Sequence, residues 1–97
     1  MKLHELLEAT TKYKERSILS VMGKQSEHVD GNFRCSDKDI ESLKGAPSSI
    51  GGYFDCSYND LTSLEGAPSS VDGNFICANN DLTSLEGAPS SVGGKFN

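Results

Sequence analysis

The chain has 97 residues and a mass of 10.4 kDa, the size of one domain at most. Hydrophobic residues make up 35% of it, which excludes a thick core of the kind found in chains that are about 45–50% apolar. The net charge of −5 excludes binding of nucleic acid through a broad basic face. No apolar run approaches the roughly 18 residues of a membrane span.

The first predicted element is a helix over residues 2–22, followed by a lead-in over residues 24–30. Gly23 is the expected helix end. Residues 9–11 are the place where the helix would divide, with Thr10 or Thr11 as the cap of a second piece. The segment lacks the apolar stretch of a signal peptide, so we expect an intracellular protein. The residues that follow helical spacing are Leu3, Leu6, Leu7, Tyr13, Ser17, Ile18, Val21 and Met22, all but Ser17 with largely apolar side chains.

From residue 31 the sequence repeats every 21 residues, and residues 52–72 and 73–93 are identical at 16 of 21 positions. Each unit starts with alternating apolar and polar residues, a pattern that predicts a half-buried strand. It continues through two leucine-type positions and returns through Ala-Pro-Ser-Ser, which favours a turn. The recurring columns are Gly31, Gly52, Gly73 and Gly94; Phe33, Phe54, Phe75 and Phe96; and Cys35, Cys56 and Cys77.

The unit F-x-C-S-x-N-x-L-T-S-L-x-G-A-P-S-S-V-G resembles the repeats of short leucine-rich-repeat proteins of large tailed bacteriophages, over residues 29–97. The resemblance implies an α/β-type repeat solenoid, a small leucine-rich-repeat stack with one short parallel sheet. Residues 1–29 are then the N-terminal helical cap and lead-in, and residues 30–97 are three 21-residue repeats plus a truncated fourth strand.

One position of the first unit departs from this pattern. In such a fold, Asn59 and Asn80 would satisfy backbone groups in the bend after each strand. Lys38 stands at the equivalent position of the first unit. We therefore expect the first bend to be looser or to be hydrogen-bonded differently.

No catalytic or metal-binding pattern is visible in the sequence. Three cysteines in one column predict small buried hydrophobes, because zinc needs a tetrahedral ligand set that such a column lacks. The acidic column Asp39, Asp60 and Asp81 predicts a solvated edge. No serine or cysteine has an evident base with an orienting acid. We therefore expect no enzyme, no metal and no cofactor.

The second and third units differ at five positions, and four of these lie on the outward strand face or directly after it. Repeat proteins bind partners on this kind of surface, and Tyr and Arg are frequent in binding hot spots. The alternative is neutral drift at positions that are free to vary. The predicted partner-binding residues are Asn32, Arg34, Tyr53, Asp55, Tyr58, Asn74, Ile76 and Asn79.

The sequence reaches residue 97 in the middle of the predicted fourth strand, without a polar capping unit. Because unpaired strand edges favour pairing, we expect a self-association edge at Lys95, Phe96 and Asn97, forming a homodimer or taking a partner. One alternative is that the chain end folds over, with Lys95 protecting the edge. Another is that the units are the vestige of a longer array.

These observations predict a non-enzymatic protein-binding module without nucleic-acid or membrane partners. The resemblance implies a phage protein that binds and inhibits a bacterial host factor, such as a defence component, in the host cytoplasm. The alternative is a packaged or structural virion protein. Residues 6–9, Leu-Leu-Glu-Ala, resemble the L-x-E site cut by head-maturation proteases of T4-like phages, and a head-targeting peptide would then be removed after Glu8. The competing interpretation is that Leu3, Leu6 and Leu7 pack as part of the cap.

Overall fold

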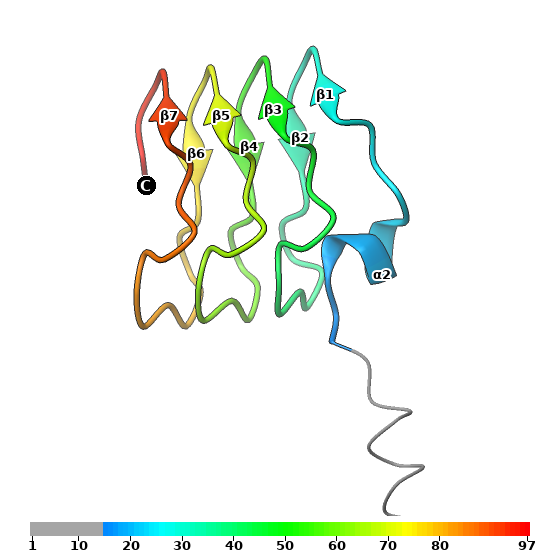
Figure 1. Ribbon diagram of the computed structural model, residues 1–97. Helices are drawn as coiled ribbons and strands as arrows, with labels where there is room; N and C mark the ends of the chain where they lie inside the picture. The colour runs from blue at the N-terminus through cyan, green and yellow to red at the C-terminus, as the bar shows by residue number, and fades with distance from the viewer. Residues whose placement is uncertain (1–14) are drawn as a thin grey trace, which may run out of the picture.

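The computed structural model describes residues 15–97 (Figure 1). This part of the chain is a small α/β-type domain with one short helix, α2 (Ile18–Met22), and two parallel sheets of two-residue strands. The strands are β1 (His28–Val29), β2 (Phe33–Arg34), β3 (Ser49–Ile50), β4 (Phe54–Asp55), β5 (Ser70–Val71), β6 (Phe75–Ile76) and β7 (Ser91–Val92).

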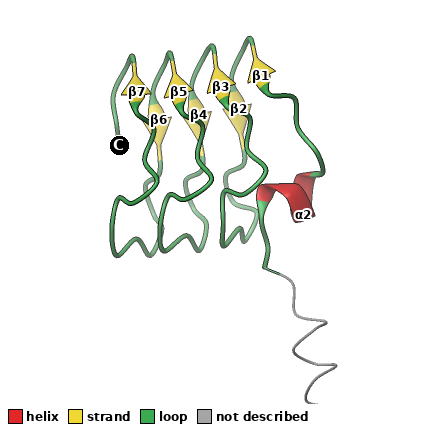
Figure 2. Ribbon diagram, in the orientation of Figure 1, coloured by secondary structure: helices red, strands yellow, loops and turns green. Residues whose placement is uncertain are grey.

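The chain alternates between the two sheets. One sheet has the order β1-β3-β5-β7 and the other has the order β2-β4-β6. In both, paired residues are 21 positions apart, as in Phe33 opposite Phe54 and Val29 opposite Ile50. The register therefore equals the sequence period, so equivalent residues of successive units lie side by side (Figures 1 and 2).

The prediction of a single sheet was wrong, because the segment interpreted as a return turn contains a second strand. The turn ends at the proline-serine pair, and Ser49 and Ile50 then form β3. Ile50 points into the core with 1% exposure. Ladder hydrogen bonds join this strand to its neighbours, as in the Gly51 amide donating to the Val29 carbonyl at 2.7 Å. This strand follows directly on the turn residues and buries one side chain, so the sequence shows no alternation there. A Phe-x-Cys alternation marks the equally short strands of the other sheet.

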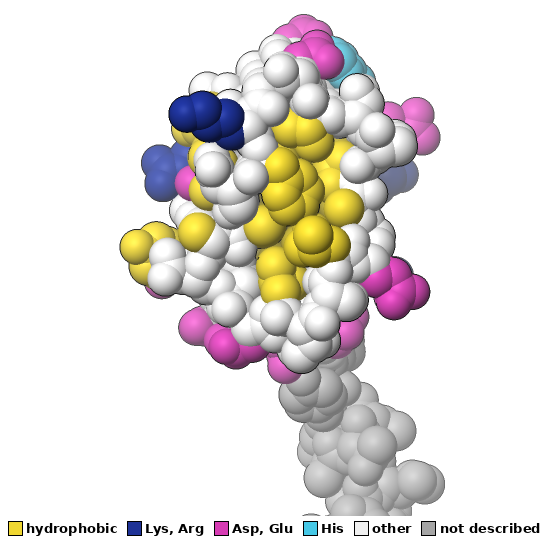
Figure 3. Space-filling view, turned by 90° about the vertical axis from the view of Figure 1, so that its left-hand side faces the viewer, with side chains coloured by type: hydrophobic (Ala, Val, Ile, Leu, Met, Phe, Trp, Pro, Cys, Tyr) yellow, Lys and Arg dark blue, Asp and Glu magenta, His cyan; other side chains and the backbone are white. Residues whose placement is uncertain are grey.

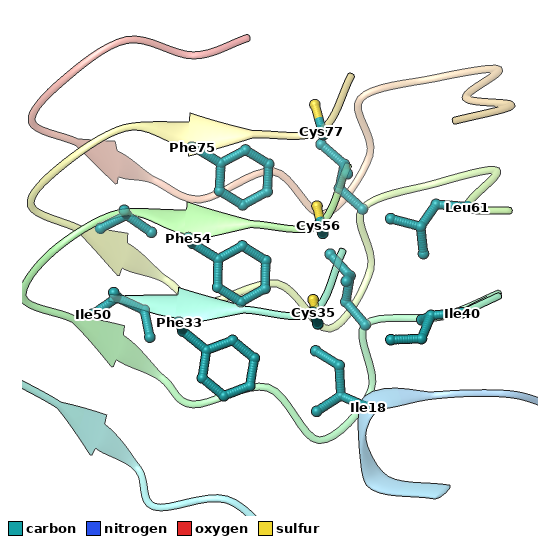
Figure 4. Close-up of a cluster of buried hydrophobic side chains, with 13 residues drawn as sticks. Ile18, Phe33, Cys35, Ile40, Ile50, Phe54, Cys56, Leu61, Phe75 and Cys77 are labelled. Atoms are coloured by element: carbon teal, nitrogen blue, oxygen red, sulfur yellow. The ribbon is translucent and has the colours of Figure 1, made fainter. Parts of the chain in front are cut away.

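The core is a set of columns that run across the units (Figure 4). The phenylalanine rings stack parallel, with centroids 5.5 Å apart for Phe33 and Phe54 and 5.3 Å apart for Phe54 and Phe75. The predicted inward positions are confirmed: the strand phenylalanines and cysteines of residues 33–77 are at most 6% exposed. Each unit thus buries a few side chains against the next unit, which gives a thin core that depends on stacking.

Helix α2 lies against the first unit and takes the place that a preceding unit would occupy. Ser17 is its N-cap and forms a capping box with Ser20, while Gly23, with φ of 81°, is the C-cap. Ile18 is fully buried, and the Leu19 amide donates to the Lys44 carbonyl at 3.0 Å. Gly23 is confirmed as the helix end.

The predicted helix over residues 2–22 is only partly tested. Residues 2–14, with Thr10 and Thr11, lie outside the described residues. Residues 15–17 are not helical, so the prediction was wrong there. The reason is that the Arg16 carbonyl accepts from the amides of Glu41 and Ser42, a pairing with the first unit that a helix would not allow. Within residues 15–97, no helix has the length and apolar character needed to cross a membrane.

Candidate protein-binding face

The outward positions of β2, β4 and β6 form a face in which neighbouring side chains complement one another. Arg34 and Asp55 lie opposite each other, with Arg34 Nε 3.7 Å from Asp55 Oδ2. Asp55 Oδ1 also accepts from the Ser57 amide at 3.0 Å and from its hydroxyl at 2.6 Å. In the third unit, Ile76 stands at the position of Asp55 and Ala78 at the position of Ser57, so both polar residues are replaced. Part of the variation on the face therefore follows from contacts within the chain, and Asp55 supports the bend after β4.

Two of the predicted binding residues also hold consecutive units together. Asn32 Oδ1 accepts from the Tyr53 amide at 2.9 Å, and Asn74 Oδ1 accepts from the Lys95 amide at 2.8 Å. Both asparagines are exposed, but the Oδ1 atom of each accepts a hydrogen bond from the backbone of the next unit. The sequence comparison between units did not indicate this role, because Tyr53 replaces the asparagine in the second unit.

Tyr58 has an unusual backbone conformation for a residue of its type. The column Asp37, Tyr58 and Asn79 has φ of 56°, 56° and 57°. Asp and Asn tolerate this left-handed conformation, whereas a bulky side chain is strained in it. The Tyr58 residue is 63% exposed, so its packing within residues 15–97 offsets little of the energetic cost of the strained backbone. Strained positions of this kind concentrate at functional sites.

The three cysteines are free and buried. Desolvation raises the pKa of Cys35 from 9.0 to about 12 and raises the pKa values of Cys56 and Cys77 in the same direction. The Cys56 thiol donates to the Ile76 carbonyl at 3.3 Å. Because the thiolate is the reactive form, these thiols are poor nucleophiles in the folded protein.

Alkylation by iodoacetamide at pH 8 should therefore distinguish the native from the unfolded chain. A pKa of about 12 leaves so little thiolate that we expect Cys35 to react roughly a thousandfold more slowly when folded than in urea. Mass spectrometry of quenched samples measures the rate at each cysteine. Equal rates in buffer and in urea would contradict burial of the column.

The structure brings together three polar residues that the sequence analysis left apart, namely His28, Ser49 and Asp30. Ser49 Oγ lies 2.6 Å from His28 Nδ1, and His28 Nε2 lies 2.9 Å from Asp30 Oδ1. The sequence alone showed no serine beside a base and an acid, and the structure places these three side chains within hydrogen-bond distance of one another. The 21-residue period contained the signal, since it places Ser49 in the same column as His28.

The end of the described chain lies beside β6, where Phe96 forms a single bridge with Phe75 and stacks on it with centroids 5.1 Å apart. Leu85 and Phe96 are 59% and 41% exposed, whereas Leu64 and Phe75, one unit earlier, are fully buried. Figure 3 shows the resulting apolar area in the middle of this end, surrounded by polar groups. Association through Lys95, Phe96 and Asn97 stays a prediction.

No cluster of three or more histidine, cysteine, aspartate or glutamate side chains within residues 15–97 is arranged to hold a metal ion. The predicted cleavage position after Glu8 lies outside the described residues. Comparison with known proteins found no matching family model, curated protein or solved structure. A function for this chain therefore has to be argued from its own residues.

Proposed function

We propose that the chain is a small leucine-rich-repeat solenoid that binds a protein partner, without catalysis, through the outward side of the β2-β4-β6 sheet. The 21-residue register of both sheets supports the solenoid. The face offers a guanidinium, two phenols and an aliphatic side chain on a rigid support, a mixture typical of binding hot spots. We define the binding face as Arg34, Tyr53, Tyr58, Ile76 and Asn79.

The conformation of Tyr58 carries this proposal. A tyrosine with φ of 56° costs about 1 kcal/mol or more relative to asparagine, the residue that occupies the next unit. Because the Tyr58 residue is 63% exposed, its ring gains little from burial within the described residues. Contact with a partner would bury that ring and offset the strain. The resemblance to phage leucine-rich-repeat proteins leads us to propose a bacterial host protein as the partner and its inhibition as the outcome.

Exchanging Tyr58 for the residue of the neighbouring unit separates binding from folding. We expect Tyr58→Asn to raise the free energy of unfolding by about 1 kcal/mol, because asparagine tolerates the left-handed conformation. The same change should weaken partner binding at least about tenfold, since buried tyrosines are common hot spots. Urea denaturation measures the first effect. Quantitative capture from bacterial lysate by the immobilised protein measures the second.

The matched control is Glu65→Gln, an exposed position away from both sheets. The control should capture the same partner as the unchanged protein and should unfold at the same urea concentration. If Tyr58→Asn captures the partner as well as the control does, the binding face is wrongly assigned. If it unfolds more easily than the unchanged protein, the strain argument fails.

A further inference from the structure

In the neutral form of the His28 imidazole, its contacts with Ser49 and Asp30 favour one tautomer. The Asp30 carboxylate accepts hydrogen bonds and cannot donate one when ionised. His28 Nε2, 2.9 Å from Asp30 Oδ1, is therefore the protonated nitrogen. In a neutral imidazole the other nitrogen is then an acceptor. His28 Nδ1 consequently accepts from the Ser49 hydroxyl, at 2.6 Å.

This arrangement has the elements that activate a serine in nucleophilic catalysis: a hydroxyl, a base that takes its proton and an acid that orients the base. The strand register holds it in place, because His28 and Ser49 are directly paired across β1 and β3. The base and the acid are exposed to solvent, with side-chain exposures of 55% for His28 and 99% for Asp30. Ser49 is half-buried, so part of its surface is accessible to an acyl donor.

We propose that Ser49 is an activated nucleophile that accepts an acyl group from an activated ester. Ser49 Oγ forms a bond to the carbonyl carbon, and the bond from that carbon to the leaving oxygen breaks. The proton of the Ser49 hydroxyl moves to His28 Nδ1 and from there to the leaving oxygen. The products are an O-acyl ester on Ser49 and a free alcohol or phenol, with no change of oxidation state. The site lies in the β1-β3-β5-β7 sheet and is independent of the proposed binding face.

The chain contains its own comparison. Ser70 and Ser91 occupy the same column as Ser49, one and two units further on. Each of them has a serine, rather than a histidine, at the paired position of the preceding strand. Ser91 is exposed, whereas Ser49 is half-buried. Accessibility alone would therefore favour Ser91, and only the contact with His28 favours Ser49.

The test is acetylation of the whole chain by p-nitrophenyl acetate at neutral pH, stopped with acid at a series of times. Cleavage after glutamate separates the three serines, since Glu65 and Glu86 lie between them. Fragmentation of each peptide places the acetyl group, and loss with hydroxylamine identifies it as an ester. We expect Ser49 to be acetylated at least about tenfold faster than Ser70 or Ser91, a fraction of the roughly 100–10,000-fold that general bases contribute in enzymes.

Two variants distinguish activation from local structure. His28→Gln keeps a hydrogen-bonding side chain but removes the base, and we expect it to lower the Ser49 rate to that of Ser70. Asp30→Asn no longer fixes the protonated nitrogen, because an amide both donates and accepts, and we expect a partial loss. Circular dichroism and urea denaturation verify folding of both variants. Equal acetylation of the three serines in the unchanged protein, or an unchanged Ser49 rate in His28→Gln, would overturn the proposal.

Discussion

Replacing Asn59 by alanine is expected to lower the free energy of unfolding by about 3–5 kcal/mol, because buried polar groups left without partners cost about 1–3 kcal/mol each. Asn59 is 7% exposed. Its Oδ1 accepts from the amides of Lys38 and Ile40, and its Nδ2 donates to the carbonyls of Cys35, Cys56 and Ser57. Alanine removes every one of these bonds at once. Urea denaturation followed by circular dichroism measures the loss.

Asn80→Ala is the matched control, since Asn80 holds the same position one unit later. Its Oδ1 accepts from Leu61, and its Nδ2 donates to three carbonyls, but the residue is only half-buried. Water can replace part of what is lost, so we expect a cost of about 1–2 kcal/mol. A loss for Asn80→Ala as large as that for Asn59→Ala would show that burial does not set the cost.

The first unit lacks this asparagine, and the sequence predicted that its bend would be looser or differently bonded. The structure shows a different set of bonds. Arg16 Nη2 donates to the Lys38 carbonyl and Arg16 Nε donates to the Asp39 carbonyl, each at 3.0 Å. Asp39 has φ of 56°, unlike Asp60 and Asp81 in the later units. The first bend is thus bonded by a side chain from the segment before α2, at carbonyls that are not equivalent to the Cys56 and Ser57 carbonyls bonded by Asn59. A comparison between units could not reveal these bonds.

The period made much of the fold predictable. A 21-residue spacing of phenylalanine, cysteine and leucine-type residues implies that equivalent residues lie side by side, and the register of both sheets matches that spacing. The same spacing relates Val29 to Ile50, and the two are paired. The second sheet was not predictable in the same way. Strands of both sheets contain two residues. Only those of the β2-β4-β6 sheet begin an apolar alternation, Phe-x-Cys, whereas those of the second sheet follow directly on the Ala-Pro-Ser turn residues.

The candidate site was predictable only in outline. Side-chain alternation indicated which residues face outward, but the backbone conformation of Tyr58 follows from the bend of the whole unit, which a pattern of residue types does not contain. The bonds of Asn32 and Asp55 to the neighbouring backbone were missed for the same reason. The contact of His28 with Ser49 was within reach, because it needs only the register.

Gly66→Ala is expected to cost about 2–5 kcal/mol, because it combines left-handed strain of about 1–2 kcal/mol with overpacking of about 1–3 kcal/mol. Gly66 has φ of 91°, and an added Cβ would lie 2.7 Å from the Lys44 amide nitrogen and 2.8 Å from the Leu43 carbonyl carbon. These are backbone atoms of the adjacent unit, so the units would have to move apart. The measurement is again the free energy of unfolding in urea.

Two other glycines separate the causes of that loss. Gly23 has φ of 81° with nothing within 4 Å of an added Cβ, whereas Gly31 has equally open space and no positive φ in the left-handed range. All three changes restrict the unfolded chain alike, which cancels in the comparison. We expect a loss of about 1–2 kcal/mol for Gly23→Ala, from strain alone. For Gly31→Ala we expect a change of about 0.5 kcal/mol at most, the usual size for an unstrained surface position.

Equal losses for Gly66→Ala and Gly23→Ala would mean that close stacking of successive units does not contribute to stability. The expected order would mean that the smallest residue is required wherever one unit passes directly over the backbone of the last.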